Sequence, residues 1–169
     1  GVDDLDLNFE DYTARVNADL VGKFVNIASR CAGFLAKRFD GKLSGQLPDA
    51  DLYQRGYSAF ADIENAYEAG DFNQAMRLIM TMADEANRYI DEKKPWVIAK
   101  QEDADDELQA VCTQGINLFR LLAAALKPVL PALAEQAELF LKAPIKHWND
   151  AEKPLLSHQI GDYQPLLTR

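Results

Sequence analysis

The stretch Ala86–Lys100 has the sequence ANRYIDEKKPWVIAK and joins the end of one helical pattern to the start of another. A proline disfavours the helical conformation in the residue before it and suits the first position of a new helix. The pattern therefore predicts that the chain leaves the first helix at Lys94 and begins a short one at Pro95. Trp96 then lies at a corner, where a large indole is easier to present than to bury.

The chain has 169 residues, of which 48% are apolar, and it contains few β-branched runs. This composition predicts a single all-α domain, a bundle of about five helices over residues 1–142 followed by an irregular tail over 143–169. No apolar run approaches the roughly 20 residues of a membrane span, and no signal peptide is evident. We expect a cytoplasmic protein with no membrane partner. Because the chain begins with Gly1 and an acidic leader, we also expect a piece of a longer protein.

The 27 acidic residues outnumber the 18 basic ones, and the net charge is −9. This balance argues against a general nucleic-acid binder, whose footprint is usually basic, but it allows a local stripe of cations. Cys31 and Cys112 are far apart in apolar helical contexts without a nearby histidine. They are predicted to be buried reduced thiols and not a disulfide or a metal site.

The first helix is expected to begin near Phe9 to Asp11, after the acidic leader, and to end at about Phe39. Its core stripe consists of Leu20, Phe24, Ile27, Cys31 and Leu35. A neighbouring arc carries hydrogen-bond donors, namely Lys23, Asn26, Arg30 and Lys37. Such a row can be an ordinary solvated flank or part of a binding surface, and the first helix alone does not decide between them.

Four further helices are expected, with bounds of about 50–69, 72–93, 104–127 and 129–141. The core stripe of the helix over 72–93 is predicted to contain Phe72, Met76, Ile79, Met80, Ala83 and Ile90. Asn87 lies at the margin of this stripe, so we expect it to find a partner within the bundle. After Lys142, prolines at 144, 154 and 165 interrupt the pattern, although enough apolar residues remain for the tail to pack onto something.

Catalytic chemistry finds little support in the sequence. The two histidines, His147 and His158, lie in the irregular tail without a carboxylate or nucleophile at a spacing typical of a triad. The sequence has no glycine-rich phosphate loop, no paired-cysteine zinc motif and no Glu-x-x-His pair. We therefore expect a binding module with no catalytic residue, metal or cofactor of its own.

Unpaired bases are recognised by stacking on aromatic or guanidinium planes while polar groups contact their edges. Trp96 can supply the plane, and Asn26 with Arg30 can supply the edge contacts. Stacking contributes about 1–3 kcal/mol per base and does not depend on net protein charge, so an acidic domain can still bind a few splayed nucleotides. The same tryptophan suits a tertiary contact that closes the bundle equally well, and both interpretations stay open on spacing alone.

Several segments together resemble the anticodon-binding domain of bacterial methionyl-tRNA synthetase. The similarity spans nearly the whole chain, and its most specific element is the Pro95-Trp96 corner combined with Asn26 and Arg30 on the first helix. The segments that carry it are Asp3–Asn8, Val16–Leu20, Lys23, Val25–Arg30, Gly33-Phe34, Ala86–Asp91, Pro95-Trp96, Gly115–Arg120, Leu126–Pro131 and Pro154–Leu156.

This resemblance implies a helical bundle that receives the CAU anticodon of methionine tRNAs. In the family, the tryptophan that matches Trp96 stacks on the first anticodon base, the residues that match Asn26 and Arg30 contact anticodon bases, and Pro95 shapes the corner. Lys23 and Lys37 are the candidate contacts to the RNA backbone. A second family asparagine, one turn before Asn26, is replaced here by Gly22, so its contact is not expected.

The family's catalytic signatures, of the His-Ile-Gly-His and Lys-Met-Ser-Lys-Ser types, are missing from this sequence, as is its zinc-binding insertion. The resemblance therefore implies that ATP, Mg and Zn belong to a catalytic domain N-terminal to Gly1, in an enzyme that ligates methionine to tRNA. It also implies that the tail over 143–169 packs back towards that domain. An alternative of a different class is a non-catalytic helical protein-interaction or scaffold module that uses Trp96 and the tail as partner contacts.

Overall fold

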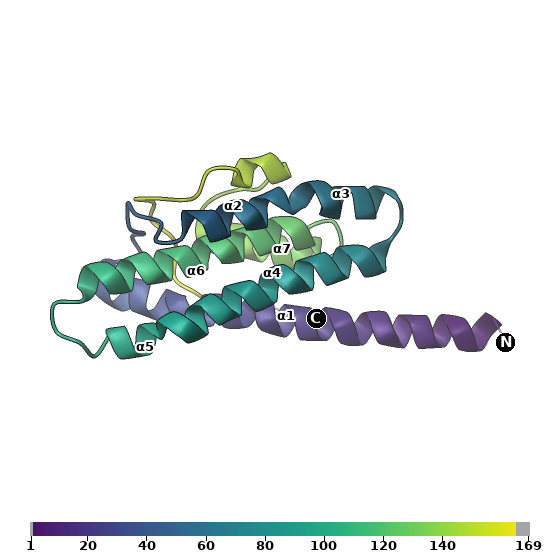
Figure 1. Ribbon diagram of the computed structural model, residues 1–169, viewed down its shortest axis with the longest axis horizontal. Helices are drawn as coiled ribbons and strands as arrows, with labels where there is room; N and C mark the ends of the chain where they lie inside the picture. Colours follow the sequence, from purple (N-terminus) through teal and green to yellow (C-terminus); the bar gives the residue numbers. More distant parts are fainter. Residues whose placement is uncertain (1, 165–169) are drawn as a thin grey trace.

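The computed structural model describes the backbone of residues 2–164 and the side chains of residues 16–164. The described part of the chain is built from helices, with a single isolated bridge between Lys42 and Gln159, and confirms the predicted all-α fold (Figure 1). The helices are α1 (Val2–Phe39), α2 (Ala50–Ser58), α3 (Phe60–Glu68), α4 (Phe72–Lys93), α5 (Pro95–Ile98), α6 (Asp105–Leu126) and α7 (Pro131–Leu141), followed by the 3-10 helix η1 (Trp148–Ala151).

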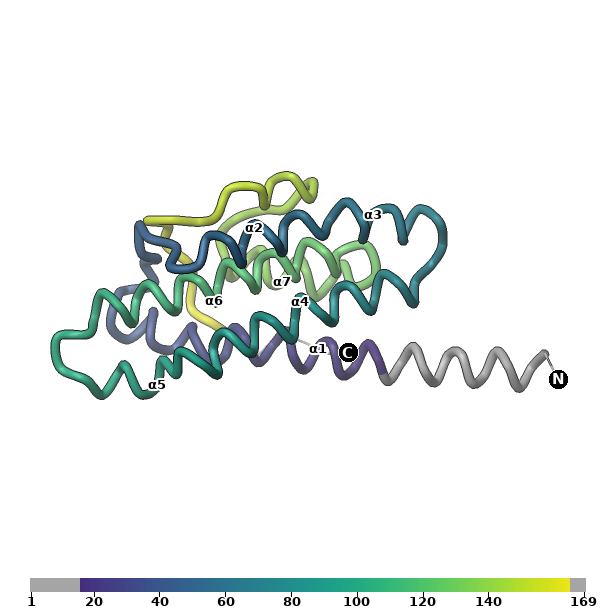
Figure 2. Tube along the Cα trace, viewed as in Figure 1, coloured from purple at the N-terminus to yellow at the C-terminus, as the bar shows by residue number. Residues whose placement is uncertain are grey.

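Helix α6 is the centre of the bundle. Every residue from Ala110 to Leu126 is buried, because α1, α4, α2, α7 and α5 all pack against this helix (Figure 2). Phe119 stacks on Phe24 of α1 with ring centres 4.3 Å apart and meets Phe140 of α7 edge-on at 6.0 Å. Because α6 is buried on all sides over this stretch, it gives the other helices a common core.

Helices α1 and α4 run in the same direction, side by side (Figure 1). Side-chain bonds join Lys23 to Asp84, Asn26 to Asn87 and Arg30 to Asp91, and the two members of each pair are 61 residues apart in sequence. A constant separation requires parallel helices in a fixed register. The crossover that this arrangement needs is supplied by α2 and α3.

Three helix boundaries differ from the sequence prediction. The helix expected over 50–69 is divided into α2 and α3 at Ala59, which keeps helical dihedrals, with φ −68° and ψ −16°, so the interruption is slight. Helix α1 begins at Val2 and not near residues 9–11, because the acidic leader is itself compatible with a helix N-terminus. Helix α7 begins at Pro131 and not at 129, since proline suits the first helical position.

The core stripe predicted for α4 is largely confirmed. Met76, Ile79, Ala83 and Ile90 are buried, whereas Met80 is only partly buried and Phe72 is 48% exposed. Phe72 is the first residue of α4, where the bundle does not cover it, and it meets Tyr67 edge-on at 6.2 Å. Cys31 and Cys112 are buried free thiols, as expected.

The tail is described as far as residue 164, and residues 165–169 of the predicted tail lie outside the described part. It packs on the bundle of its own chain through Asn117 and Arg120 of α6. Asn117 exchanges two hydrogen bonds with the backbone of Leu155, and Arg120 donates to the carbonyls of Asp150 and Lys153. The expected packing of this tail towards a catalytic domain stays a prediction. In the described part of the chain, no helix is both long enough and apolar enough for a membrane span.

Candidate nucleic-acid interface

The corner between α4 and α5 has the predicted form. Lys94 adopts the left-handed conformation, with φ 52° and ψ 66°, which ends α4 and places Pro95 at the first position of α5. Pro95 and Ile98 are buried, whereas Trp96 and Val97 are 39% and 43% exposed. The two faces of this single helical turn therefore have different roles, because one anchors α5 to the bundle and the other presents the indole.

Arg30 of α1 connects the donor row to this indole. Its guanidinium carbon lies 5.9 Å from the centre of the Trp96 ring, within the range of a cation–π interaction. The guanidinium also pairs with the Asp91 carboxylate and donates to the Asn87 side-chain oxygen at 2.6 Å and to the Asn87 carbonyl at 3.3 Å. These contacts fix the guanidinium in place beside an exposed aromatic ring.

Asn87 of α4 is the hydrogen-bonding centre of the site. Its amide nitrogen donates to the carbonyls of Lys23 and Ala83, at 3.2 and 3.0 Å, and its amide oxygen accepts from Asn26 at 3.1 Å as well as from Arg30. The prediction that Asn87 needs a partner within the bundle is confirmed. This one amide holds both Asn26 and Arg30 in the orientations that the surface presents.

Between α1 and α4 lies an open groove of about 460 Å³. Lys23 binds Asp84 at 2.6 Å and lies 3.7 Å from Asp19, and the hydrogen bond with Asp84 raises the pKa of Lys23. The groove is lined by Ala18, Asp19, Gly22, Lys23, Asn26, Arg30, Asp84, Asn87 and Asp91. Its mixed charges and amides can hydrogen-bond to a polar ligand from both walls.

The structure brings together most of the predicted site residues. Lys23, Asn26 and Arg30 share the groove, and Trp96 adjoins it through Arg30. Lys37 is exposed two turns beyond Arg30 on the same side of α1, so it extends the row without lining the groove.

The two acidic residues that α4 contributes to the site, Asp84 and Asp91, were not predicted. A signal for them exists in the sequence, because Asp84, Asn87 and Asp91 repeat on α4 the spacing of Lys23, Asn26 and Arg30 on α1. Matching intervals of three and four residues place each set on one helix face. The two sets of residues form hydrogen bonds and ion pairs with each other only because α1 and α4 pack in the register that places them side by side.

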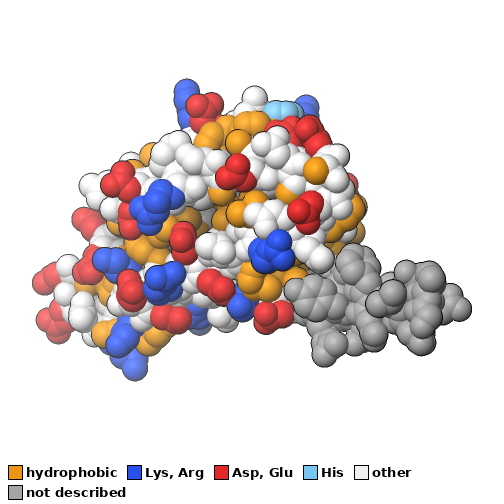
Figure 3. Space-filling model, turned by 45° about the vertical axis from the view of Figure 1, so that its right-hand side comes forward, with side chains coloured by type: hydrophobic (Ala, Val, Ile, Leu, Met, Phe, Trp, Pro, Cys, Tyr) orange, Lys and Arg blue, Asp and Glu red, His pale blue; other side chains and the backbone are white. Residues whose placement is uncertain are grey.

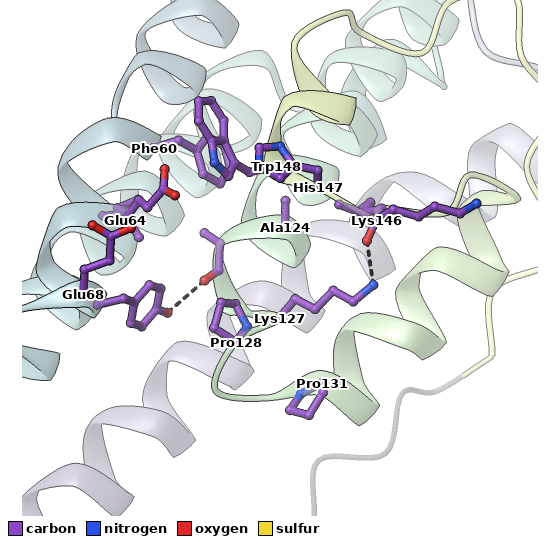
Figure 4. Close-up of a pocket in the computed structure, with 14 residues that line it drawn as sticks. Phe60, Glu64, Glu68, Ala124, Lys127, Pro128, Pro131, Lys146, His147 and Trp148 are labelled. Carbon is purple, nitrogen blue, oxygen red and sulfur yellow. Dashed lines mark hydrogen bonds between the residues drawn. The ribbon is translucent and has the colours of Figure 1, made fainter. Parts of the chain in front are cut away.

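A second cavity, of about 520 Å³, lies among α3, the end of α6 and the tail (Figure 4). Phe60, Tyr67 and Trp148 contribute aromatic walls, and Phe60 stacks on Trp148 with ring centres 5.9 Å apart. Tyr67 donates to the Ala125 carbonyl at 2.8 Å, and burial raises its pKa to about 12. None of the predicted site residues lines this cavity, and among the described residues no cluster of His, Cys, Asp and Glu is arranged to hold a metal ion.

Acidic and basic side chains alternate over the face of the molecule seen in Figure 3, with apolar side chains exposed between them. The donors of the groove between α1 and α4 likewise lie among carboxylates, since Asp19, Asp84 and Asp91 line it together with Lys23 and Arg30. This face therefore does not carry the broad basic footprint that a general nucleic-acid binder usually has.

An all-α bundle with an exposed tryptophan beside fixed guanidinium and amide donors has the features of a helical domain that binds unpaired nucleotides. A comparison of the sequence with known protein families gives a specific match. The sequence model described as "Anticodon binding domain of methionyl tRNA ligase" matches residues 43–162, and the chain belongs to this family. The matched range includes Trp96 and Asn87, whereas Asn26 and Arg30 lie before it.

The chain is similar over its whole length to curated methionine–tRNA ligases. It is 68% identical to that of Stenotrophomonas maltophilia strain K279a and 63% identical to that of Xanthomonas oryzae pv. oryzae strain PXO99A, in each case over 169 residues. These residues cover 100% of this chain and 24% of each relative, so the chain spans about a quarter of their length.

Among solved structures, the free methionyl-tRNA synthetase of Mycobacterium tuberculosis matches with a TM-score of 0.80. The match covers 90% of this chain and 32% of that one at 22% sequence identity. At this level of identity the likeness shows the fold alone, and it supports the helical bundle described above.

Proposed function

We propose that this domain recognises the CAU anticodon of methionine-specific tRNA. Trp96 serves as the stacking platform for the first anticodon base, and Arg30 and Asn26 contact base edges. Pro95 sets the corner that presents the indole, while Lys23 and Lys37 meet the RNA backbone. The observation that supports this assignment best is the contact of Arg30 with an indole that is still 39% exposed.

The geometry is suited to single-stranded and not to duplex RNA. The indole is 39% exposed, which leaves ring surface for a splayed base to stack on, and the adjoining groove offers donors and acceptors from Asn26 and Asn87. Because stacking and hydrogen bonding supply this affinity, the net charge of −9 does not oppose it strongly at the ionic strength of a cell.

In this proposal the chain is part of a methionine–tRNA ligase, the enzyme that attaches methionine to tRNA with ATP in the cytoplasm. The relatives that share this domain carry that name, and one solved structure is of the Mycobacterium tuberculosis methionyl-tRNA synthetase in complex with methionyl-adenylate. The catalytic domain, with ATP, Mg and Zn, then lies in the same polypeptide, and the residues of this chain contribute recognition only.

A titration with two RNA hairpins tests the proposal. One hairpin carries a CAU loop, and its matched control differs only at the first anticodon base. Binding is followed by fluorescence anisotropy of labelled RNA at two salt concentrations, since the affinity of cationic contacts depends on salt. We expect the CAU hairpin to bind more tightly than the control. Equal binding, or no binding by either, would contradict recognition by this domain and favour a helical protein-interaction module.

A further inference from the structure

Helix α5, which carries Trp96, is a single turn and cannot hold its own position. Its first contact with the bundle is the burial of Pro95 and Ile98. Its N-terminal end is defined by Lys94, whose carbonyl accepts from the backbone nitrogens of Val97 and Ile98 at 2.9 and 3.2 Å. These bonds lie within the corner itself, whereas α5 is placed in the bundle by its packing against α6 and by a side-chain contact from α1.

Arg38, in the last turn of α1, supplies this contact. One guanidinium nitrogen donates to the carbonyl of Ala99, the residue that caps the C-terminal end of α5, at 2.6 Å. The other terminal nitrogen lies 3.6 Å from the carboxylate of Asp105, the first residue of α6. The planar fork of one arginine thus joins the ends of three helices, which a single ammonium group cannot do with the same geometry.

The electrostatics of the contact favour this arrangement. The carbonyls at the C-terminal ends of α1 and α5 carry partial negative charge, and Asp105 adds a full one. Arg38 and Ala99 are also 61 residues apart, so the contact continues the register of the α1 and α4 pairs into α5. Arg30 therefore contacts the indole while Arg38, two turns further along α1, fixes the helix that bears it.

We propose that Arg38 is a positioning residue for Trp96, which holds α5 so that the indole stays beside Arg30. The part of this inference that concerns RNA rests on the function proposed above, while the part that concerns the indole does not. The side chain of Arg38 is 41% exposed, so the alternative role for this cation is a direct contact with an RNA phosphate. The two roles make opposite predictions about salt dependence.

The first measurement needs no RNA. In a Trp148→Phe background Trp96 is the only tryptophan, so quenching of the emission by acrylamide, a neutral quencher that local charge does not attract or repel, reports the exposure of its indole. We expect Arg38→Met to raise the quenching constant, by at most about 2.5-fold, the ratio of full exposure to the present 39%. Arg38→Lys should give an intermediate value. Arg77→Met is the matched control, because Arg77 is an exposed arginine of α4 that bonds to Gln74, many turns from the corner.

The second measurement uses the CAU hairpin. We expect Arg38→Met to weaken binding about tenfold, within the range that stacking contributes, and to leave the slope of affinity against salt unchanged. A slope reduced by about 0.7, the value for one phosphate contact to a single strand, would identify Arg38 as a direct ligand and overturn the proposal. Unchanged quenching in Arg38→Met would overturn it as well.

Circular dichroism melts show whether each variant is folded. If Arg38→Met does not fold, Arg38→Lys replaces it in both measurements. If the hairpin fails to bind the parent chain, the proposed function is contradicted, while the quenching measurement still decides whether Arg38 positions the indole.

Discussion

The guanidinium of Arg30 lies 5.9 Å from the centre of the Trp96 ring and hydrogen-bonds at the same time to the side chain of Asn87. A residue of α4 and a residue of the corner between α4 and α5 thus both contact the same cation of α1. The indole remains 39% exposed beside this cation. This relationship leads to predictions that separate binding from stability.

Replacing Trp96 with alanine should weaken binding of the CAU hairpin by about 1–3 kcal/mol, the contribution of one stacked base. The thermal melt should shift little, because the ring is substantially exposed. Trp148→Ala is the matched control, since Trp148 packs on Phe60 and its loss should lower the melting temperature without changing RNA affinity. A collapsed melt for Trp96→Ala would show instead that the indole is structural.

Arg30→Ala should lower hairpin affinity and make it less dependent on salt, because a cation that binds nucleic acid releases counterions. The change in slope should stay below the roughly 0.7 of a phosphate contact, since Arg30 is proposed to contact base edges. The same hairpin titrations over a range of salt measure both effects. Arg77→Ala should leave both values unchanged. A slope that does not move in Arg30→Ala would mean that the guanidinium makes purely polar contacts with the RNA or none.

Gly22 is an exposed position within α1, and a Cβ added there meets no atom within 4 Å. Gly22→Ala should therefore raise the free energy of unfolding by about 0.5–1 kcal/mol, through the higher helix propensity of alanine. Gly22→Asn places an amide at the groove and should tighten hairpin binding relative to Gly22→Ala. Urea unfolding and hairpin titration measure the two effects, and equal affinity of both variants would contradict the second.

Burial raises the pKa of Tyr67 from 10.0 to about 12. The neutral phenol is favoured in the folded chain, so its contribution to stability is complete below pH 10 and is lost as the pH rises through about 12. We expect the phenolate absorbance of Tyr67 to develop well above pH 10 in the folded chain. Tyr53, whose pKa burial also raises to about 12, titrates in the same range, so Tyr67→Phe should reduce the absorbance step there and make unfolding less dependent on pH. A Tyr67 that titrates near pH 10 would contradict the prediction.

Local signals in the sequence predicted the elements that they control directly. The Lys94-Pro95 junction and the bounds of α4 follow from the chemistry of proline and from the apolar period, and the structure confirms both. The division of α2 from α3 left no such signal, because Ala59 is an ordinary helical residue with helical dihedrals.

The pairing of α1 with α4 is a property of the folded chain, and short-range patterns do not encode it. Asn26 and Arg30 could be selected as candidates, and Asn87 as a residue that needs a partner, but the contacts among them depend on a register across 61 residues. Likewise, the route of the tail depends on Asn117 and Arg120, polar residues that the core of α6 buries. Helical periodicity does not predict that an arginine of α6 is buried, or that it donates to carbonyls of the tail.

The internal bonds of Asn26, Arg30 and Asn87 have a consequence for discrimination between RNAs. If bases bind at this groove, many of their contacts form by exchange, because Asn87, the amide nitrogen of Asn26 and the terminal nitrogens of Arg30 already have partners. A matching base replaces those partners and gains little net energy, whereas a mismatched one leaves a polar group unsatisfied at a cost of about 1–3 kcal/mol. Contacts at the groove would then contribute modestly to affinity but would discriminate strongly against RNAs of the wrong sequence.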